Sequence, residues 1–228
     1  MDARALEYDA KGKGRPIVLV PGGLTGWLSW IPHQERLTER YRAVRVQPVH
    51  NELGSRGEIM EPGYDDEVER ECLRVTLDEL ALGPVDVAAW SGGARSMIDF
   101  SQTYPERVRS LTLIEPPALW AIRGDPEMEL EIAHLDAYIE RVAGKPVSED
   151  DLAEFLEIAG FVEERSLAST HPAWERWFPH RTALANQRGL GKKDRTLEEL
   201  ASFDRPVLLV KGTVSTGWLR RVIDALGR

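Results

Sequence analysis

The chain has little of what marks a secreted or membrane-bound protein. Cys72 is the only cysteine among 228 residues, so no disulfide can form within the chain. It lies in a helical pattern with Val68 and Val75, which predicts a packing role. No apolar run approaches the roughly 18 residues that suggest a membrane span, and the first residues lack a signal-peptide-like apolar core. These absences predict a cytoplasmic protein that has no membrane partner.

Basic residues are also scarce. The chain has 29 lysines and arginines against 38 aspartates and glutamates, which gives a formal net charge of −9. Such a chain has no basic face to follow a phosphate backbone, so we expect no nucleic-acid partner. The sequence contains neither a GxGxxG nor a GxxxxGK[ST] phosphate-binding motif, and no cluster of metal ligands. We therefore expect a small-molecule substrate, with no cofactor and no metal.

The regular elements alternate along most of the chain. Hydrophobic residues make up 42% of it, enough for one sizeable core. Short apolar runs bounded by turn residues indicate buried parallel strands at 16–20, 43–49, 85–90, 110–115 and 206–211. Helical patterns separate them, at 30–41, 65–82, 92–105 and 215–227. This alternation predicts an α/β fold, with a mostly parallel sheet covered by helices on its faces.

The segment 117–205 interrupts the alternation, because it is long, acidic and helical in pattern, with no convincing strand. We expect it to form a helical cap inserted after the strand that ends at Glu115. The core would then consist of residues 1–116 and 206–228. Within the cap, Ser148-x-x-Asp151 is a capping-box pattern that predicts the start of a helix.

Aromatic side chains are concentrated in one part of this cap. The residues concerned are His171, Trp174, Trp177, Phe178 and His180. They could form a lid over a pocket or the cap's own small core, and aromatic residues at helical spacing favour the core. Under the cap we expect a substrate pocket lined by Trp27, Trp90 and Trp120, with Trp174 and Trp177 as further candidates.

A motif with chemical meaning follows the strand at 85–90. Residues 89–93 read Ala-Trp-Ser-Gly-Gly and lead into a helix, which is the strand-turn-helix context of a nucleophile elbow. At such a turn a strained serine backbone lifts the hydroxyl above the sheet edge, so the pattern favours Ser91 as a nucleophile. Ala89 replaces the first glycine of the usual motif and is the least disruptive replacement. The alternative is a plain glycine-rich turn.

The loop after the strand at 16–20 carries a family resemblance. Pro21-Gly22-Gly23 resembles the His-Gly-x-x loop of α/β-hydrolases, with proline in place of the usual histidine. Trp30 falls where haloalkane-dehalogenase-like and epoxide-hydrolase-like members carry a tryptophan. Residues 104–108, Tyr-Pro-Glu-Arg-Val, are similar to that family's link from the nucleophile helix to the next strand. The resemblance covers nearly the whole chain outside the cap and implies the α/β-hydrolase fold.

The same resemblance implies roles for several further residues. The backbone N–H groups of Gly23 and Gly92 would form an oxyanion hole, although the first glycine pair could simply turn the chain. Glu115 stands where some dehalogenase-like members keep a glutamate that orients the catalytic histidine. An unpaired carboxylate at the end of an apolar strand would cost several kcal/mol, so Glu115 needs a partner. The alternative is a structural glutamate that accepts hydrogen bonds from nearby backbone N–H groups.

The catalytic base is missing from this pattern. The resemblance implies a histidine after one more strand beyond 215–227, whereas all five histidines precede that point and the chain given ends at Arg228. His50 is at the carboxyl end of a predicted strand, where sites in such folds lie, although a solvated loop histidine is commoner. His171 and His180 fall in the cap, where a lone histidine is usually structural. We assign none of them as the base.

The combined features predict an esterase-like serine hydrolase that forms an acyl-enzyme at Ser91. A serine at this position argues against dehalogenase or epoxide-hydrolase chemistry, which needs a carboxylate nucleophile. The alternative is a non-catalytic member of the superfamily that binds a small hydrophobic ligand. The outer edge of the strand at 206–211 could also pair with another chain, which would lead to self-association.

Overall fold

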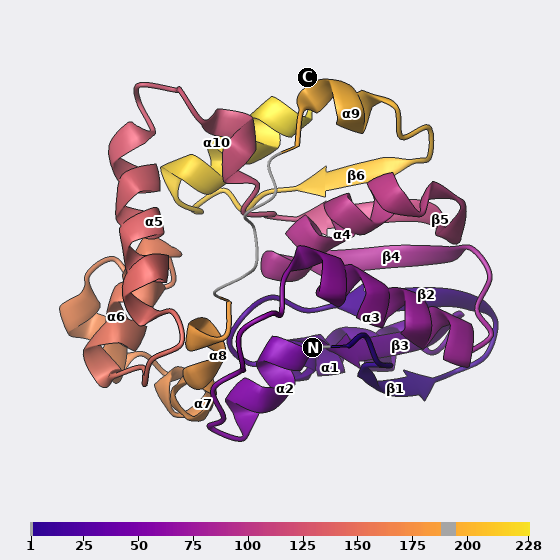
Figure 1. The fold of residues 1–228 in the computed structure, drawn as a ribbon, viewed down its shortest axis with the longest axis horizontal. Coiled ribbons are helices and arrows are strands. Elements are labelled where there is room, and N and C mark those ends of the chain that lie inside the picture. The colour runs from indigo at the N-terminus through magenta and orange to yellow at the C-terminus, as the bar shows by residue number, and fades with distance from the viewer. Residues whose placement is uncertain (1, 188–194) are drawn as a thin grey trace.

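The computed structural model describes residues 2–187 and 195–228. Its centre is a six-stranded sheet with the strand order β1-β3-β2-β4-β5-β6 (Figure 1). The strands are β1 (Glu7–Lys11), β2 (Arg15–Val20), β3 (Tyr41–Gln47), β4 (Val85–Trp90), β5 (Val108–Ile114) and β6 (Val207–Val210). Strand β1 pairs with β3 in antiparallel orientation, and all the other neighbours are parallel. The predicted α/β fold with a mostly parallel sheet is confirmed.

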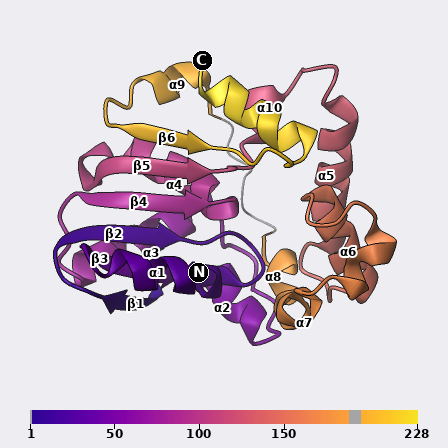
Figure 2. The same ribbon diagram turned by 180° about the vertical axis from the view of Figure 1, so that it is seen from behind.

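Helices cover both faces of this sheet. They are α1 (Ile31–Leu37), α2 (Val49–Ser55), α3 (Asp66–Glu79), α4 (Gly92–Thr103) and α10 (Gly217–Leu226). Helices α3 and α4 lie on the face turned to the viewer in Figure 1, and α1 and α10 lie on the opposite face, seen in Figure 2. Side chains such as Leu19, Val44 and Val87 are buried between the layers. Each fully buried side chain of this size stabilises the fold by about 1.5–3 kcal/mol.

Two elements at the amino-terminal side of the sheet differ from the sequence expectation. Strand β1 was not predicted, because Glu7–Lys11 is polar and mostly exposed, as an outer strand can be. The strand predicted at 43–49 ends at Gln47, and α2 begins at once with Val49. Pro48 lies at the N-cap of α2 and has no N–H to continue a strand, which explains the early end.

The chain between β5 and β6 contains helices and, in its described residues, no strand. The elements are η3 (Leu119–Ile122), α5 (Glu129–Val142), α6 (Glu149–Ile158), η4 (Arg165–Thr170), α7 (Trp174–Trp177), η5 (Phe178–His180), α8 (Thr182–Ala185) and α9 (Leu197–Ala201). Helices α5 to α8 lie beyond the carboxyl ends of the parallel strands (Figure 1). This is the side of the sheet on which the β4–α4 turn lies.

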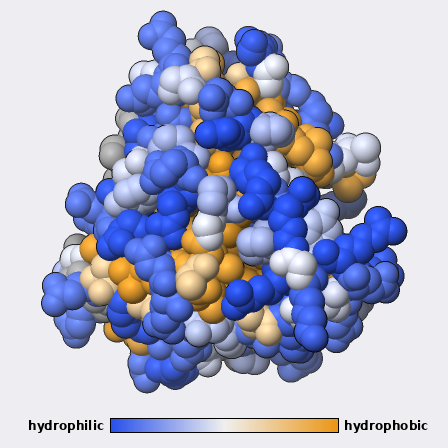
Figure 3. Space-filling model, turned by 90° about the vertical axis from the view of Figure 1, so that its right-hand side faces the viewer, coloured by the Kyte–Doolittle hydropathy of each residue, from blue (hydrophilic) through white to orange (hydrophobic). Residues whose placement is uncertain are grey.

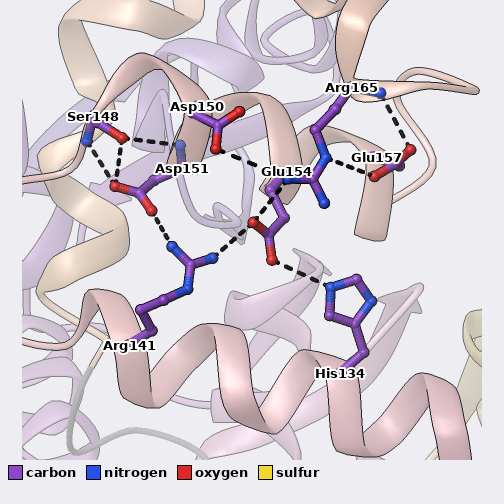
Figure 4. A network of polar contacts seen from close by, with 8 residues as sticks. All are labelled: His134, Arg141, Ser148, Asp150, Asp151, Glu154, Glu157 and Arg165. Carbon is purple, nitrogen blue, oxygen red and sulfur yellow. Dashed lines mark hydrogen bonds and ion pairs between the residues drawn. The ribbon is translucent and has the colours of Figure 1, made fainter.

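A network of charged side chains joins helices α5 and α6 (Figure 4). Its centre is Glu154, which is nearly buried and lies 2.8 Å from Arg141 Nη2, 3.2 Å from His134 Nε2 and 3.4 Å from Arg165 Nη1. The helix that carries Glu154 begins at the predicted capping box, in which Ser148 and Asp151 bond reciprocally. A buried carboxylate is costly unless it is paired, and Arg141 and His134 of α5 provide this pairing for Glu154 of α6.

The opposite end of the molecule, at the amino ends of the parallel strands, has a different surface. Figure 3 shows that charged and polar side chains cover most of this face and separate its apolar patches from one another. In the described part of the chain, none of the helices is long and apolar enough to cross a membrane.

Candidate active site

Ser91 lies at the sharp turn between β4 and α4. Its backbone angles are φ 51° and ψ −125°, a conformation that non-glycine residues rarely adopt and that costs on the order of 1–3 kcal/mol. Its N–H donates to the carbonyl of Ile114 at 2.8 Å, and its own carbonyl accepts from the N–H of Arg95 at 3.1 Å. The residue is thus held between the sheet and the first turn of α4, with a half-buried side chain. The strained turn is the geometry expected of a nucleophile elbow, and the role of the serine stays a prediction.

Close contacts explain why glycines surround this turn. A Cβ atom on Gly22 would lie 2.9 Å from Ser91 Cβ and 3.5 Å from Ser91 Oγ. A Cβ atom on Gly93 would lie 2.3 Å from the carbonyl oxygen of Pro21, which no side chain can tolerate. The loop after β2 therefore packs directly against the elbow, and it can do so only because both positions lack a side chain.

The loop after β2 is fixed by a helix that the sequence did not predict. The side-chain Nδ2 of Asn51, in α2, donates to the carbonyl oxygen of Gly23. A Cβ atom on Gly92 would meet nothing within 4 Å, so the space beside this residue is open. Gly92 follows Ser91 directly and Gly23 follows the glycine that contacts Ser91, and their role as an oxyanion hole stays a prediction.

Glu115 follows β5 and also has an unusual backbone, with a φ of 47°. Its Oε1 atom accepts a hydrogen bond from the N–H of Gly212 at 2.8 Å and another from the hydroxyl of Ser215. The carboxylate thus ties the end of β5 to the loop after β6, as the structural interpretation expects. Both bonds are made by Oε1, and neither partner is a histidine. The role of Glu115 in orienting a histidine therefore stays a prediction.

The structure shows the surroundings of His50 and His171. His50 lies in the first turn of α2 and is buried, so the expectation of a solvated loop histidine is wrong. Burial and the nearby charge of Arg95 lower the pKa of His50 to about 3, which makes its imidazole a weak base. His171 stacks on Trp177 and its Nδ1 accepts the N–H of Ala173. In residues 2–187 and 195–228, no histidine is hydrogen-bonded to Ser91.

A buried polar cluster surrounds His50. Its Nδ1 atom lies 4.0 Å from Oε1 of Glu69, and burial raises the pKa of Glu69 to about 7. Arg95 pairs with Asp66 at 3.5 Å, and its charge acts on both buried groups. Within the described part of the chain, His50 Nδ1, Tyr64 OH, Glu69 Oε2 and Arg95 Nε have no hydrogen-bond partner. Polar atoms of this kind are usually satisfied by ordered water.

Aromatic contacts connect the elbow to the helical segment above it. The ring of Trp90 lies edge-on to Phe161, with 6.3 Å between centroids, and Phe161 lies 5.3 Å from Trp177. Trp174 and Trp177 are buried in an apolar cluster formed mainly by the helical segment itself. Their favoured interpretation as packing residues is confirmed.

The other two tryptophans of the expected pocket lie in different surroundings. Trp27 packs its ring over the guanidinium of Arg45, with 5.2 Å to the ring centroid. Trp120 is half-buried in η3 and packs against the main core. Their participation in a substrate pocket, together with Trp90, stays a prediction.

Comparison with known proteins identifies the family. Residues 17–228 match the alpha/beta hydrolase family. The chain belongs to this family. This agrees with the resemblance found in the loop at Pro21 and in the turn at Ser91. In the described residues, no three histidine, cysteine, aspartate or glutamate side chains come together as ligands for a metal ion.

Similar proteins include hydrolases of several kinds. A protein of Azorhizobium caulinodans named “Putative carbamate hydrolase RutD” is 32% identical over 109 residues, which are 48% of this chain and 40% of that protein. Among solved structures, an alpha/beta hydrolase from Sphaerobacter thermophilus has a TM-score of 0.67 and 22% identity, and covers 97% of this chain and 83% of its own. The carboxylesterase CesB from Bacillus subtilis has a TM-score of 0.68 and 20% identity, over 99% and 78%. These structures show the common fold.

Proposed function

We propose that this protein is a serine hydrolase that acts on an ester-like or other acyl substrate through an acyl-enzyme at Ser91. The observation that carries the proposal is the strained backbone of Ser91 at the β4–α4 turn. Strain of this kind is retained where it positions a reactive group. The similarity to a carbamate hydrolase and to a carboxylesterase supports an acyl substrate.

The neighbouring groups supply parts of the acyl-transfer chemistry. Ser91 Oγ attacks the substrate carbonyl, and the oxygen that becomes negatively charged accepts hydrogen bonds from the N–H groups of Gly23 and Gly92. The hydrogen bond from Asn51 to the carbonyl oxygen of Gly23 holds the peptide unit that follows this N–H group. Donors fixed before the reaction stabilise the developing charge without reorganisation, which is why a rigid loop is favoured here.

The proton of Ser91 also needs an acceptor. The family resemblance assigns that role to a histidine oriented by Glu115, whose carboxylate is held at the carboxyl edge of the sheet by Gly212 and Ser215. In the described residues no histidine takes this place beside Ser91. The two hydrogen bonds that Glu115 accepts in the described residues both go to Oε1, so Oε2 is the atom that we assign to the imidazole.

We propose that the segment 117–205 covers this site as a cap and shapes the substrate pocket. Helices α5 to α8 lie on the side of the elbow (Figure 1), and Trp90 contacts Phe161 of this segment. Trp27, Trp90 and Trp120 are the proposed aromatic lining. Cap and elbow together would hold a small molecule with both an apolar part and an acyl group.

Hydrolysis of p-nitrophenyl acetate tests the function. We expect the 228-residue chain to hydrolyse this ester barely above background, because loss of the base in a triad removes on the order of 10⁶ in turnover and leaves roughly 10³–10⁴ over water. This residual rate comes from the oxyanion hole and substrate binding, so it should be nearly the same in Ser91→Ala. Fast turnover that depends on Ser91 would contradict this expectation and make His50, His171 and His180 the candidates for the base. Fast turnover that is unchanged in Ser91→Ala would contradict the proposed nucleophile.

A second candidate is a ligand-binding member of the family. The observation that favours it is the lack of a histidine bonded to Ser91 in the described residues. Such a protein would bind small hydrophobic esters and release them unchanged, with no acylation of Ser91. Incubation with an activated ester followed by mass analysis separates the two candidates.

A further inference from the structure

We propose that the side-chain amide of Gln187 binds the acyl part of the substrate and favours acyl groups that carry a second oxygen acceptor. The inference deepens the proposed function, since it rests on the same site at Ser91. It names a residue of the helical segment as a specificity determinant and defines a substrate class: esters or carbamates with an acceptor oxygen near the scissile carbonyl.

Gln187 reaches the loop that packs on the nucleophile. A Cβ atom on Gly23 would lie 2.9 Å from Gln187 Nε2, closer than real Cβ atoms approach another atom. The neighbouring Gly22 touches Ser91, because a Cβ atom there would lie 3.5 Å from Ser91 Oγ. The Gln187 amide thus occupies the space that a side chain at position 23 would fill, one residue from the contact with Ser91.

The backbone before Gln187 is anchored to the core, so this placement is specific. Asn186 is buried, and its Oδ1 atom accepts the N–H of Met60 at 2.8 Å. Its Nδ2 atom donates to the carbonyl of Glu58 at 2.9 Å and to that of His50 at 3.3 Å. These bonds engage both ends of the Asn186 amide with backbone groups far away in the sequence.

Close packing of two short helices strengthens the anchor. A Cβ atom on Gly54, in α2, would lie 2.5 Å from the Cα atom of Ala183, in α8. The two helix backbones touch directly at this point, which only a glycine allows. The helix that carries Asn51, the residue bonded to Gly23, is therefore the same helix against which the Gln187 segment packs.

The side-chain amide of Gln187 can donate hydrogen bonds to a bound molecule. A primary amide nitrogen carries two N–H donors, and within the described part of the chain no group accepts a hydrogen bond from Gln187 Nε2. The adjacent carbonyl of Gly23 already accepts from Asn51. Gln187 is half-buried, so a bound molecule can reach it. An oxygen on the acyl group beside the elbow is the partner that this donor fits.

Binding of two matched amides tests the inference without requiring turnover. N-phenyl-2-methoxyacetamide and N-phenylbutanamide have the same shape and differ by an ether oxygen in place of a methylene. We expect the wild-type protein to bind the methoxy compound about 3 to 10 times more tightly, the effect of one hydrogen bond. Gln187→Met should remove the preference. Gln102→Met, in α4, is the matched control and should keep it.

The outcomes separate this inference from the proposed function. Equal binding of both amides by the wild type, a preference that persists in Gln187→Met, or no binding of either amide at millimolar concentration would overturn it. Gln187→Glu, which keeps the side-chain length but has no N–H donors, should also lose the preference. Ser91→Ala should keep the preference, because binding needs no nucleophile. A failed acylation test with an intact preference would therefore reject the proposed chemistry alone.

Discussion

At the residue scale, His50 and Glu69 form a buried pair whose pKa values move in opposite directions. His50 has its pKa lowered to about 3, so the unfolded chain takes up a proton before the folded one does. The free energy of unfolding therefore declines as pH falls from 6.5 towards 3. Glu69 has its pKa raised to about 7, so the folded state keeps a proton that the unfolded chain has lost. The contribution of Glu69 to the free energy of unfolding therefore declines as pH rises from 4.5 towards 7.

Glu69→Gln should expose this balance. In the wild type, the raised pKa of Glu69 makes the free energy of unfolding decrease as pH rises. Glu69→Gln lacks this titration. The free energy of unfolding of the variant minus that of the wild type should therefore increase by on the order of 2 kcal/mol between about pH 5 and pH 7. Chemical denaturation at a series of pH values measures this difference. Glu67→Gln is the control, because Glu67 is exposed on the same helix. A pH-independent difference between Glu69→Gln and the wild type would show that Glu69 is already ionised at pH 5.

The candidate site residues that could be located from the sequence are those at strand ends. Ser91 and Glu115 each follow an apolar run directly, so their place at the carboxyl edge of the sheet could be predicted. Asn51, Asn186 and Gln187 could not, because they lie in or beside short helices that have no periodic pattern of their own. Their positions depend on the contact of Gly54 with Ala183, which is a long-range packing event.

At the scale of elements, β6 is the outermost strand of the sheet. It pairs only with β5 in the described residues, and it exposes Val207 by 46% and Leu208 by 58%. Next to it lies a groove of about 520 Å³ between α4, α9 and α10, lined by Leu113, Leu200 and Phe203 among others. A strand edge with free N–H and C=O groups beside apolar surface is a site for pairing with another strand.

We therefore predict that the 228-residue chain self-associates through β6. Sedimentation velocity at increasing concentration should show dimers or larger species, and Leu208→Lys should shift the protein towards monomer, because a charge at the edge opposes strand pairing. Val214→Lys provides the matched control, since Val214 is 93% exposed but lies outside the strand. A wild-type protein that stays monomeric, or equal association by both variants, would contradict the prediction.

The regular elements differ in how well the sequence predicted them, and the reason is physical. Strands β2, β4 and β5 are buried on both faces, which requires continuous apolar runs that are easy to recognise. Strand β1 has an exposed edge and accordingly has a polar sequence, so its pairing depends on β3 rather than on its own pattern. Helix α2 is one of the short elements whose position is set by tertiary contacts.

At the scale of the whole molecule, the site is assembled where three parts of the chain meet. The sheet supplies Ser91 at a strained turn, the loop after β2 lies against it at Gly22, and Gln187 of the segment between β5 and β6 lies against the same loop at Gly23. The contact between Gly22 and Ser91 is so close that it leaves no room for a side chain at position 22. The central claim is that this convergence serves to present Ser91 as a nucleophile.

The most direct test is to locate the acyl group after reaction with an activated ester. The wild-type chain is incubated with p-nitrophenyl acetate, and its peptides are analysed by mass spectrometry. We predict an acetyl group on Ser91 that forms slowly and persists, because both its formation and its hydrolysis need a base. Ser91→Ala should carry no acetyl group in the corresponding peptide. A wild-type protein acetylated only at lysines or other serines, or not at all, would contradict the account.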